Sequence, residues 1–552
     1  MYSDKENINI LTALLLAHGV RHAVVCPGSR NAPITHNLCE AREMTCVSVT
    51  DERSAAFVAL GKAQALGEPV VVCVTSGSAL VNTLPAVVEA WYQHVPIIVV
   101  SADRPAEMIG QLQGQTMPQQ KTLEAFWAKE VSLPEPHDDV ERWYCNRLTN
   151  EALCAMKQYG GGPVHINVPI SEPLFNFTTA ELPTERRVSL MDNHLWPSEL
   201  TEEFLVSSRP MLVVGQLQCT VARRVSGAIR RLEESVVVLS EQLATCGNAP
   251  CHFDEALIGI GEQEAYKPDY IIYIGDTLVS KRAKHFLQHC HPKSCVVVNA
   301  SGELTDVTMN VTDVVVCPVE DALDSLCEKL ESGDVALGNE ASAFRGRWAM
   351  ALDKWAIRCK VFEPAYSQMM AVRRLCEQTN GQECHMQFAN SSAVRLGQLY
   401  SSHHLYVNRG VNGIEGSLST AVGFASEKDV TVYCVIGDLS FFYDQNALWN
   451  GVGKRHLRMV VLNNGGGGIF HQLRGLEQSP YRDSFVSATH TASAKGVCEA
   501  TGVAYKAASN EEELAEGISW ITRGQATGPL LLEVFTNAEI DAREYKKYLE
   551  TK

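Results

Sequence analysis

Two stretches decide the fold, VTVYCVIGD (430–438) and RMVVLNNGGGG (458–468). Each is an apolar run of strand length that ends in polar residues or glycines, as buried parallel strands do. The residues between them suffice for one crossover, and a right-handed parallel crossover brings both strand ends to the same edge of a sheet. We therefore expect Asp438 and Asn464 to meet at the edge where doubly wound folds bind ligands.

The residue types at these strand ends indicate a metal diphosphate site. The side-chain oxygens of Asp438 and Asn464 suit a hard cation such as Mg²⁺, which completes its octahedron with phosphates and water. The glycines at 465–468 let the backbone approach a phosphate closely, which a Cβ would hinder. A glycine run alone is more often a flexible loop, but after a strand and two asparagines it favours a phosphate site.

Length and composition are typical of a soluble multidomain protein. The chain has 552 residues, 45% of them hydrophobic and 20% charged. This length predicts about three domains. The start, MYSDKENINI, lacks the apolar segment of a secretory signal, and the longest apolar runs fall short of the ~18 residues that span a bilayer. We expect a cytoplasmic protein without membrane insertion.

Charge and cysteine usage argue against other classes of protein. A net charge of −17 disfavours binding to nucleic acids and anionic membranes, which are themselves negative. The 18 cysteines are scattered without a CxxC pair, so we expect reduced thiols. The stretch KHFLQHCHPKSC (284–295) could bind zinc, but no second ligand cluster pairs with it. A helix with partly exposed histidines that ends before Pro292 is favoured.

Apolar strands alternate with helical stretches in three consecutive regions, the pattern of an α/β protein with mainly parallel sheets. The polar segments 182–199 and 331–342 interrupt this pattern and are expected to be linkers. We predict three Rossmann-like domains at 1–182, 200–330 and 345–552. The expected strands are HAVVCPG, CVSV, PVVVCVTSG, VPIIVVSAD and PVHINVP, then MLVVG, VVVLS, DYIIYIGD and CVVVNA, then HLYVN, VTVYCVIGD, RMVVLNN and LLLEVF.

Glu52 is the candidate functional acid of the first region. It follows the strand CVSV and opens a helix, where a lone glutamate usually balances the helix macrodipole. The turns VTSGSALVN (74–82) and SADRPAE (101–107) also follow strands directly, so small and polar residues gather with Glu52 at one sheet edge. That context favours a binding role for Glu52.

Seven segments stand in a fixed order along the chain: PGSRNAP (27–33), TDERSAA (50–56), TSGSA (75–79), ADRPAE (102–107), ANSSAVR (389–395), NRGVNGIEG (408–416) and GDLSFFYDQNAL (437–448). Together they resemble the thiamine diphosphate-dependent enzymes and, more closely, the 2-succinyl-5-enolpyruvyl-6-hydroxy-3-cyclohexene-1-carboxylate synthase family of menaquinone biosynthesis. The resemblance implies a transferase that condenses 2-oxoglutarate with isochorismate and releases CO₂. It also implies a homodimer or homotetramer, in which the pyrimidine-binding first domain and the diphosphate-binding third domain come from different subunits.

The resemblance assigns a coenzyme site. Glu52 would be the catalytic residue, as partner of the pyrimidine ring, and Ile414 would hold thiamine diphosphate in a bent shape. Mg²⁺, or Mn²⁺ in its place, would be bound by Asp438, Asn464 and the carbonyl of Gly466. The other coenzyme contacts implied are Thr75, Gly437, Leu439, Ser440, Gly467 and Ile469.

Both implied substrates are dicarboxylates, so an acidic protein needs basic side chains to bind them. An arginine fork can grip a carboxylate with two hydrogen bonds, although a single arginine is more often part of a surface ion pair. The resemblance implies that Ser391 and Arg395 hold the succinyl carboxylate. The isochorismate contacts implied are Ser29, Arg30, Arg104, Gln115 and Lys281, although Gln115 could be a plain loop amide. The predicted substrate site also includes Arg282, Arg409 and Phe470.

Two alternatives stay open. Another thiamine diphosphate-dependent 2-oxoacid decarboxylase, or an acetohydroxyacid synthase-like lyase, would share the coenzyme site but has no need for so many basic residues. A noncatalytic nucleotide-binding module would need only the glycine-rich turns and would give Glu52 no role. A flavin in the central region is not expected, because MLVVGQLQC (211–219) lacks the GxGxxG pattern.

Overall fold

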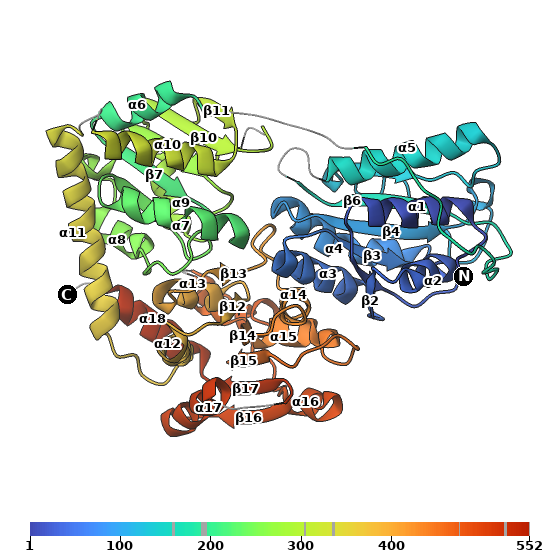
Figure 1. Cartoon of the computed structure of the whole chain (residues 1–552). Helices are drawn as coiled ribbons and strands as arrows, with labels where there is room; N and C mark the ends of the chain where they lie inside the picture. The colour runs from blue at the N-terminus through green and yellow to red at the C-terminus, as the bar shows by residue number, and fades with distance from the viewer. Residues whose placement is uncertain are drawn as a thin grey trace. The chain divides into compact units, whose positions relative to one another are not determined.

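The computed structural model describes residues 1–156, 161–188, 196–302, 305–333, 337–473, 475–523 and 527–550. These residues form three open sheets with helices between successive strands, so the predicted α/β class is confirmed (Figure 1). The chain divides into two compact units. The first comprises Met1–Asp192, Gly410–Asp429 and Tyr443–Leu457, and the second comprises Asn193–Arg409, Val430–Phe442 and Arg458–Lys552.

The sheet of the first unit has six strands in the order β2-β1-β3-β4-β6-β5, with parallel pairings. The five strands expected in this region are confirmed. The sixth, β5, reads KEVS and has a single fully buried residue, so it carried no apolar signal. The strands are β1 (His22–Val25), β2 (Thr45–Ser48), β3 (Val70–Val74), β4 (Ile97–Asp103), β5 (Lys129–Ser132) and β6 (Val164–Pro169).

Helices pack on both faces of this sheet, because its central strands are buried along their whole length. One set shares an apolar core with alternate strand residues: α1 (Glu6–Ala17), α2 (Ala32–Glu40) and α5 (Asp139–Ala155). The other set packs on β1, β3 and β4: α3 (Glu52–Leu66) and α4 (Ser78–Tyr92).

A close helix pair explains why the segment after residue 409 belongs to the first unit. Every residue of α14 (Ser417–Ala425) is buried, and α14 packs along α3. A Cβ added at Gly61 of α3 would lie 2.0 Å from the carbonyl oxygen of Thr420, and one at Gly423 of α14 would lie 2.1 Å from that of Val58. The two backbones therefore touch, which only glycine allows.

The second unit contains two sheets. The first of them has the order β11-β10-β9-β7-β8 with parallel pairings. Its four expected strands are confirmed, and β11 is an addition at the edge. The strands are β7 (Pro210–Val214), β8 (Val237–Ser240), β9 (Tyr270–Ile274), β10 (Ser294–Asn299) and β11 (Asp313–Val316). The helices on one face are α6 (Ser198–Val206), α7 (Cys219–Glu233) and α10 (Val319–Ser332), and those on the other are α8 (Phe253–Ile260) and α9 (Lys281–Gln288).

The other sheet has the order β13-β12-β14-β15-β17-β16. The pairings of β12 with β13 and β14, and of β17 with β15 and β16, are parallel. The strands are β12 (His385–Phe388), β13 (Leu405–Tyr406), β14 (Val432–Gly437), β15 (Leu457–Asn463), β16 (Ala504–Ala508) and β17 (Leu530–Phe535). The helices are α12 (Gln368–Thr379), α13 (Ser392–Tyr400), α15 (Asp438–Tyr443), α16 (Lys495–Thr501), α17 (Glu511–Arg523) and α18 (Ala538–Leu549). Four of these strands were expected, and β12 and β16 were not.

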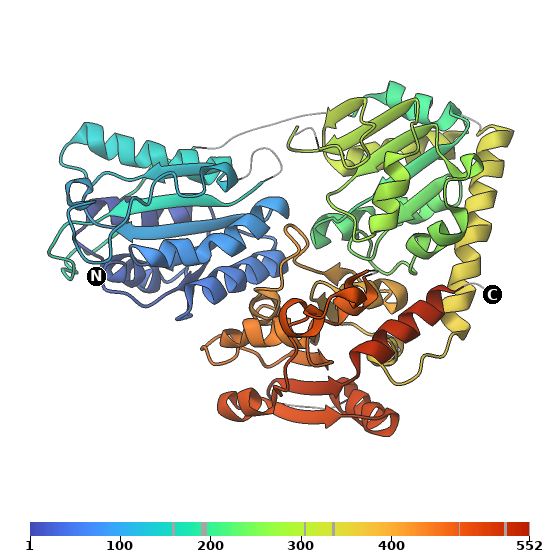
Figure 2. The same ribbon diagram turned by 180° about the vertical axis from the view of Figure 1, so that it is seen from behind.

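One apolar core connects the two sheets of the second unit. The long helix α11 (Asn339–Val361) contributes Trp348 and Trp355 to this core, and it lies beside both sheets in Figures 1 and 2. The start of α11 falls inside the expected linker 331–342. Residues 189–195 and 334–336 of the two expected linkers lie outside the described residues, and the three domain boundaries stay a prediction.

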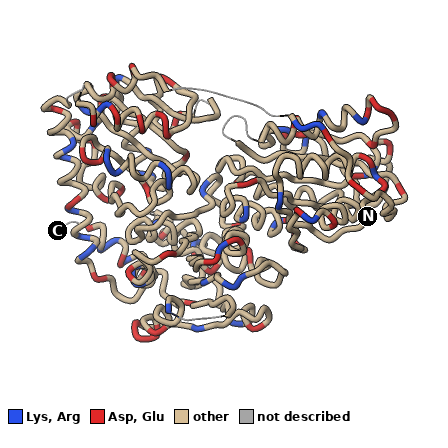
Figure 3. The backbone as a smooth tube through the Cα atoms, viewed as in Figure 1, with Lys and Arg blue, Asp and Glu red and all other residues tan. Residues whose placement is uncertain are grey.

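The distribution of charged residues and the character of the helices both bear on function. Acidic and basic residues are interspersed along the chain (Figure 3). The negative net charge therefore leaves room for locally basic sites. Within the described ranges, no helix combines the length and the apolar character needed to cross a membrane.

Candidate active site

Predicted site residues gather at one edge of the first sheet. The strands β2, β1, β3 and β4 are neighbours in that sheet. Their carboxyl ends lead into the segments that carry the predicted residues, listed here in strand order: Glu52, Ser29 with Arg30, Thr75, and Arg104. This placement is the one that the strand-end argument predicted.

Glu52 is the first residue of α3, but it does not cap that helix. The preceding Asp51 is the N-cap, and its carboxylate accepts hydrogen bonds from the backbone N–H groups of Arg53 (2.9 Å) and Ser54 (3.2 Å). The half-buried Glu52 carboxylate accepts one hydrogen bond, from Asn82 Nδ2 at 3.2 Å, through Oε2. Its Oε1 has no hydrogen-bond partner among the described residues, so this oxygen remains for a ligand.

The basic residues of this unit differ in how much of their hydrogen-bonding capacity is already used. Arg30 is only 6% exposed and donates to the Ile170 carbonyl and to Glu172, each at 3.0 Å. Arg104 is half-buried and donates from Nε to the carbonyl of Gly114 at 3.3 Å. Arg104 therefore keeps more donors for a ligand than Arg30 does.

Two further predicted residues of the first unit expose their side chains. The backbone of Gln115 is held by a hydrogen bond from the Ser76 hydroxyl to its carbonyl, at 2.8 Å, and its side chain is exposed. Ile414 is 43% exposed, and it follows Gly410 and Val411, whose N–H groups donate to the buried Glu89 carboxylate. The segment that presents Ile414 is thus tied to α4.

In the second unit, Asp438 is the first residue of α15, directly after β14, and is 2% exposed. Its Oδ2 accepts hydrogen bonds from the N–H groups of Gly465 (2.9 Å) and Gly466 (3.0 Å). Burial raises the pKa of this carboxyl, although these hydrogen bonds oppose the rise. Asp438 therefore ties the end of β14 to the glycine run after β15, as the crossover argument expected.

His490 is a residue of this site that the sequence did not predict. Its Nε2 lies 3.4 Å from Asp438 Oδ2 and has no hydrogen-bond partner among the described residues. No strand-end pattern marks this position in the sequence.

The glycine run forms a wall where a side chain cannot fit. A Cβ on Gly466 would lie 2.7 Å from the carbonyl oxygen of Ser487, and that oxygen also accepts a hydrogen bond from Gly467 N at 2.6 Å. A Cβ on Gly468 would lie 2.2 Å from Asn464 Nδ2. The run lines an open pocket together with Asn464, His471, Asp483, Ser487, Thr489, Asn537, Ala538 and Glu539.

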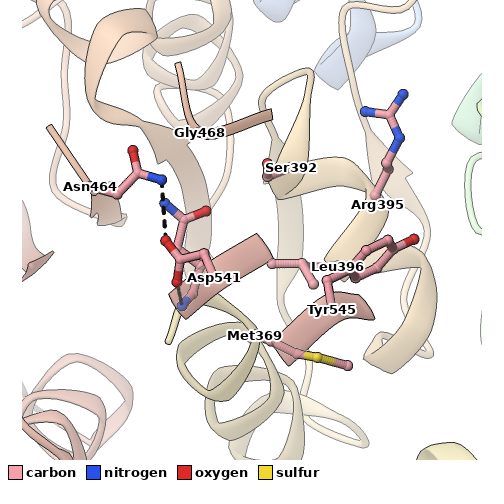
Figure 4. A pocket seen from close by; sticks show the side chains of 9 residues that line it. Met369, Ser392, Arg395, Leu396, Asn464, Gly468, Asp541 and Tyr545 are labelled. Carbon is pink, nitrogen blue, oxygen red and sulfur yellow. Dashed lines mark hydrogen bonds between the residues drawn. The ribbon is translucent and has the colours of Figure 1, made fainter. Parts of the chain in front are cut away.

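Asn464 lines this pocket and also a second one, which is shown in Figure 4. Its Nδ2 donates to Asp541 Oδ2 at 3.2 Å, and the same oxygen accepts from the Thr536 hydroxyl at 2.8 Å. The amide orientation is therefore fixed by α18, and the amide oxygen of Asn464 is directed away from Asp541 in Figure 4.

The donor set fits a hard divalent cation. The Asp438 carboxylate, the Asn464 amide oxygen and the carbonyls of the glycine run are oxygen donors of the kind that Mg²⁺ prefers. The glycine run supplies a surface at which only backbone fits. These residues could therefore hold a metal-bound diphosphate.

Three predicted substrate residues line one cavity of about 280 Å³ in the second unit, namely Lys281, Arg282 and Arg395. Lys281 is exposed, and no described residue forms an ion pair or hydrogen bond with its ammonium group. Arg395 donates one hydrogen bond, to the carbonyl of Ser391 at 3.0 Å. Ile469 lines the same cavity, and it immediately follows the glycine run.

Acidic residues that the sequence did not predict also line this cavity. Asp254 pairs with Arg282. Burial raises the pKa of Glu255 to about 8 and that of Glu241 to about 7. Glu241 accepts hydrogen bonds from the N–H groups of Val279 and Ser280, just before α9. A pattern did exist for Glu241, because it directly follows β8.

The remaining predicted residues have these positions. Arg409 is buried and donates to Asn390 Oδ1 at 3.1 Å. Gly437 ends β14, and a Cβ there would meet no atom within 4 Å. Leu439 and Ser440 form the first turn of α15 with Asp438, and Phe470 follows Ile469 in a 3₁₀ turn. Thr75 is buried behind Gly28, and its hydroxyl has no partner among the described residues.

Comparison with known proteins defines the class. Residues 8–124 match the N-terminal TPP binding domain of thiamine pyrophosphate enzymes, and residues 389–534 match their C-terminal TPP binding domain. The first segment carries Glu52, and the second carries Asp438 and the glycine run. Fold and site therefore define an enzyme of the thiamine diphosphate-dependent class.

Similar proteins narrow the family. The 2-succinyl-5-enolpyruvyl-6-hydroxy-3-cyclohexene-1-carboxylate synthase of Bacteroides thetaiotaomicron is 42% identical, over 99% of each chain. The proteins of the same name from Desulfotalea psychrophila and Porphyromonas gingivalis are 35% and 32% identical, over 97% and 99% of this chain and 98% and 97% of theirs. The chain belongs to this synthase family.

Proposed function

We propose that the protein decarboxylates 2-oxoglutarate and adds the resulting succinyl carbanion equivalent to isochorismate. The products would be 2-succinyl-5-enolpyruvyl-6-hydroxy-3-cyclohexene-1-carboxylate and CO₂, within menaquinone biosynthesis. The observation that carries this proposal is the cavity that combines Lys281, Arg282 and Arg395 with Ile469, the residue next to the glycine run. The Lys281 ammonium and the Arg395 guanidinium, in a cavity next to a diphosphate site, suit a substrate with two carboxylates.

Thiamine diphosphate, when bound, would supply the electron sink that lets CO₂ leave. Asp438, Asn464 and the carbonyl of Gly466 would hold Mg²⁺, for which Mn²⁺ could substitute, and the glycine run would contact the diphosphate. Glu52 would hydrogen-bond the pyrimidine ring through the oxygen that Asn82 leaves free. The other coenzyme contacts proposed are Thr75, Ile414, Gly437, Leu439, Ser440, Gly467 and Ile469.

Binding of the two substrates would be divided among the basic residues. Lys281 and Arg395 would bind carboxylates in the cavity, where Arg282 is already paired with Asp254. We assign Ser391 to the succinyl carboxylate with Arg395, and Arg409 would position this segment through Asn390. The proposed isochorismate contacts in the first unit are Ser29, Arg30, Arg104 and Gln115, and Phe470 would border the substrate site.

The same proposal extends to assembly and location. A homodimer or homotetramer, in which Glu52 of one subunit serves the diphosphate site of another, is what the family resemblance supports. We propose a cytoplasmic location, and the net charge of −17 supports a protein that does not bind nucleic acid. Light scattering coupled to gel filtration measures the oligomeric state, and an active monomer would contradict the shared site.

The proposed reaction is tested by incubating the protein with 2-oxoglutarate, isochorismate, thiamine diphosphate and Mg²⁺. We expect release of CO₂ and an adduct with the mass of the proposed product. Pyruvate in place of 2-oxoglutarate is the control, because it lacks the second carboxylate that the cavity would bind. Efficient turnover of pyruvate with none of 2-oxoglutarate would favour a different 2-oxoacid decarboxylase or lyase.

A further inference from the structure

Two cysteines and a histidine form a compact cluster that the proposed reaction does not use. The sulfur atoms of Cys219 and Cys246 and a ring nitrogen of His404 all lie within 4.8 Å of one another. Cys219 is the first residue of α7, Cys246 follows β8, and His404 immediately precedes β13. The cluster thus joins the two sheets of the second unit, and none of its members lines the cavity of the predicted substrate residues.

The surroundings prepare these atoms to bind a metal. His404 is 8% exposed, and its Nδ1 lies 3.3 Å from the carbonyl oxygen of Thr245. A neutral ring that donates from Nδ1 to this carbonyl keeps a lone pair on Nε2, the usual arrangement of a metal-binding histidine. The Tyr406 hydroxyl donates to Cys219 Sγ at 2.7 Å, and the first turn of a helix also favours a thiolate there.

We propose that Cys219, Cys246 and His404 bind a zinc ion. Thiolate and imidazole are the ligands that zinc prefers, and two ligands of a tetrahedral zinc ion stand about 3.5 to 3.8 Å apart. Because the ligand atoms of the cluster lie within 4.8 Å of one another, they need to approach one another by about 1.3 Å at most on binding. Both cysteines are free thiols and half-buried, so an ion can reach them from solvent. A water molecule would occupy the fourth position.

The zinc ion would reinforce an existing seam between the two sheets. Near the cluster, Leu405 N donates to the carbonyl of Gln242 at 2.8 Å, and Gln216 Nε2 donates to the carbonyl of Val407 at 3.2 Å. The segment after His404 leads to Arg409, which is predicted to act at the substrate site. Zinc bound to His404 would therefore stabilise the attachment of this segment to the sheet that contains β7 and β8.

A competing cluster on the same unit offers a matched control. Glu262, His285 and His289 also place their ligand atoms within 4.8 Å of one another, but all three are exposed. The two histidines belong to the KHFLQHCHPKSC stretch, and α9 ends at Gln288, before Pro292, with exposed histidines, as expected. This cluster has no sulfur ligand, so the two sites differ spectroscopically.

The test uses the full-length protein, stripped of metal and reduced, and titrated with Co²⁺ alone. Thiolate-to-cobalt charge-transfer absorption reports binding by cysteine and is silent for the oxygen ligands of the coenzyme site. We expect the absorption to saturate at about one equivalent of Co²⁺ per chain and to disappear when Zn²⁺ is added. Added Zn²⁺ should also raise the melting temperature.

Variants locate the site. The absorption should be lost in Cys246→Ser and Cys219→Ser and retained in His289→Ala and in Cys39→Ser, which changes an exposed thiol of the first unit. Circular dichroism checks that each variant is folded, and the wild-type titration remains informative if one is not. Absence of charge-transfer absorption in the wild type, its retention in both cysteine variants, or a Cys219–Cys246 disulfide in the protein purified without reductant would overturn the proposal.

Discussion

Gly466→Ala is the substitution whose effect follows most directly from the geometry of the diphosphate site. An alanine Cβ would lie 2.7 Å from the Ser487 carbonyl oxygen, closer than such contacts occur in proteins, and the obstacle is backbone. Either the glycine run or the Ser487 carbonyl must move. Movement strains two hydrogen bonds, from Gly467 N to Ser487 O (2.6 Å) and from Gly466 N to Asp438 Oδ2 (3.0 Å).

The size of the effect follows from these two bonds. A neutral hydrogen bond contributes about 1 kcal/mol and one to a charged group about 1.5 to 3 kcal/mol, so losing both costs about 2.5 to 4 kcal/mol. If the loop relaxes in the free protein, this cost appears in coenzyme binding, as roughly a 60- to 700-fold weaker affinity. If it does not relax, the cost appears in the free energy of unfolding.

Two measurements on the same variant capture both possibilities. Calorimetric titration with thiamine diphosphate and Mg²⁺ gives the affinity, and urea denaturation gives the free energy of unfolding. Gly496→Ala in α16 is the control, because a Cβ there meets no atom within 4 Å. The interpretation is refuted if Gly466→Ala binds the coenzyme within twofold of wild type and also unfolds at the same urea concentration.

Three further predictions concern the cavity and the packing of the first unit. Lys281→Ala should raise KM for 2-oxoglutarate by about 10- to 150-fold with little change in kcat, because one charged hydrogen bond is lost. Lys293→Ala, which lies outside the cavity, should leave KM unchanged. Equal KM values for Lys281→Ala and the wild type would remove Lys281 from the site. Burial raises the pKa of Glu255 to about 8 in the folded protein, whereas the ordinary value, near 4.5, holds in the unfolded chain. The contribution of the neutral carboxyl to stability is therefore fully present below pH 4.5, and it is lost as pH rises through about 8. Urea denaturation at several pH values should therefore show the wild type losing up to about 1.4 kcal/mol per pH unit relative to Glu255→Gln over that interval, and parallel curves would contradict the shift. Gly61→Ala should lower the free energy of unfolding by about 1 to 3 kcal/mol, because its Cβ would meet a carbonyl of α14 at 2.0 Å. Gly227→Ala in α7 is the control, because a Cβ there has open space and should not lower it. Equal urea midpoints for Gly61→Ala and the wild type would contradict the close packing.

Much of the fold is predictable because its strands are buried on both faces. The runs IIVVSAD of β4 and LRMVVLN of β15 are buried at every position, so their apolar character alone marks them. Some strands that were not expected lack this apolar character. Of the four strands that were not expected, β5 (KEVS) and β16 (AYKAA) lie at sheet edges; β5 is mostly half-buried and β16 is largely exposed, and neither has an apolar run.

The residues of the candidate site also fall into those that the sequence predicts and those that it does not. Residues that directly follow strands, such as Asp438 and Thr75, could be predicted because parallel strands end at one edge. His490 approaches Asp438 from a segment without a strand, and only tertiary packing places it there. The acids Asp254 and Glu255 belong to α8, and sequence cannot show that this helix faces Arg282. Periodicity therefore finds strand-end residues and misses those that other elements bring to the site.

The proposal that Glu52 activates the coenzyme bound at Asp438 is tested most directly by hydrogen–deuterium exchange at C2 of bound thiamine diphosphate. In Glu52→Gln, we predict that exchange slows by about 10²- to 10⁴-fold while the coenzyme still binds with an affinity near that of the wild type. Exchange at the wild-type rate in that variant, with coenzyme fully bound, would contradict the proposed role of Glu52.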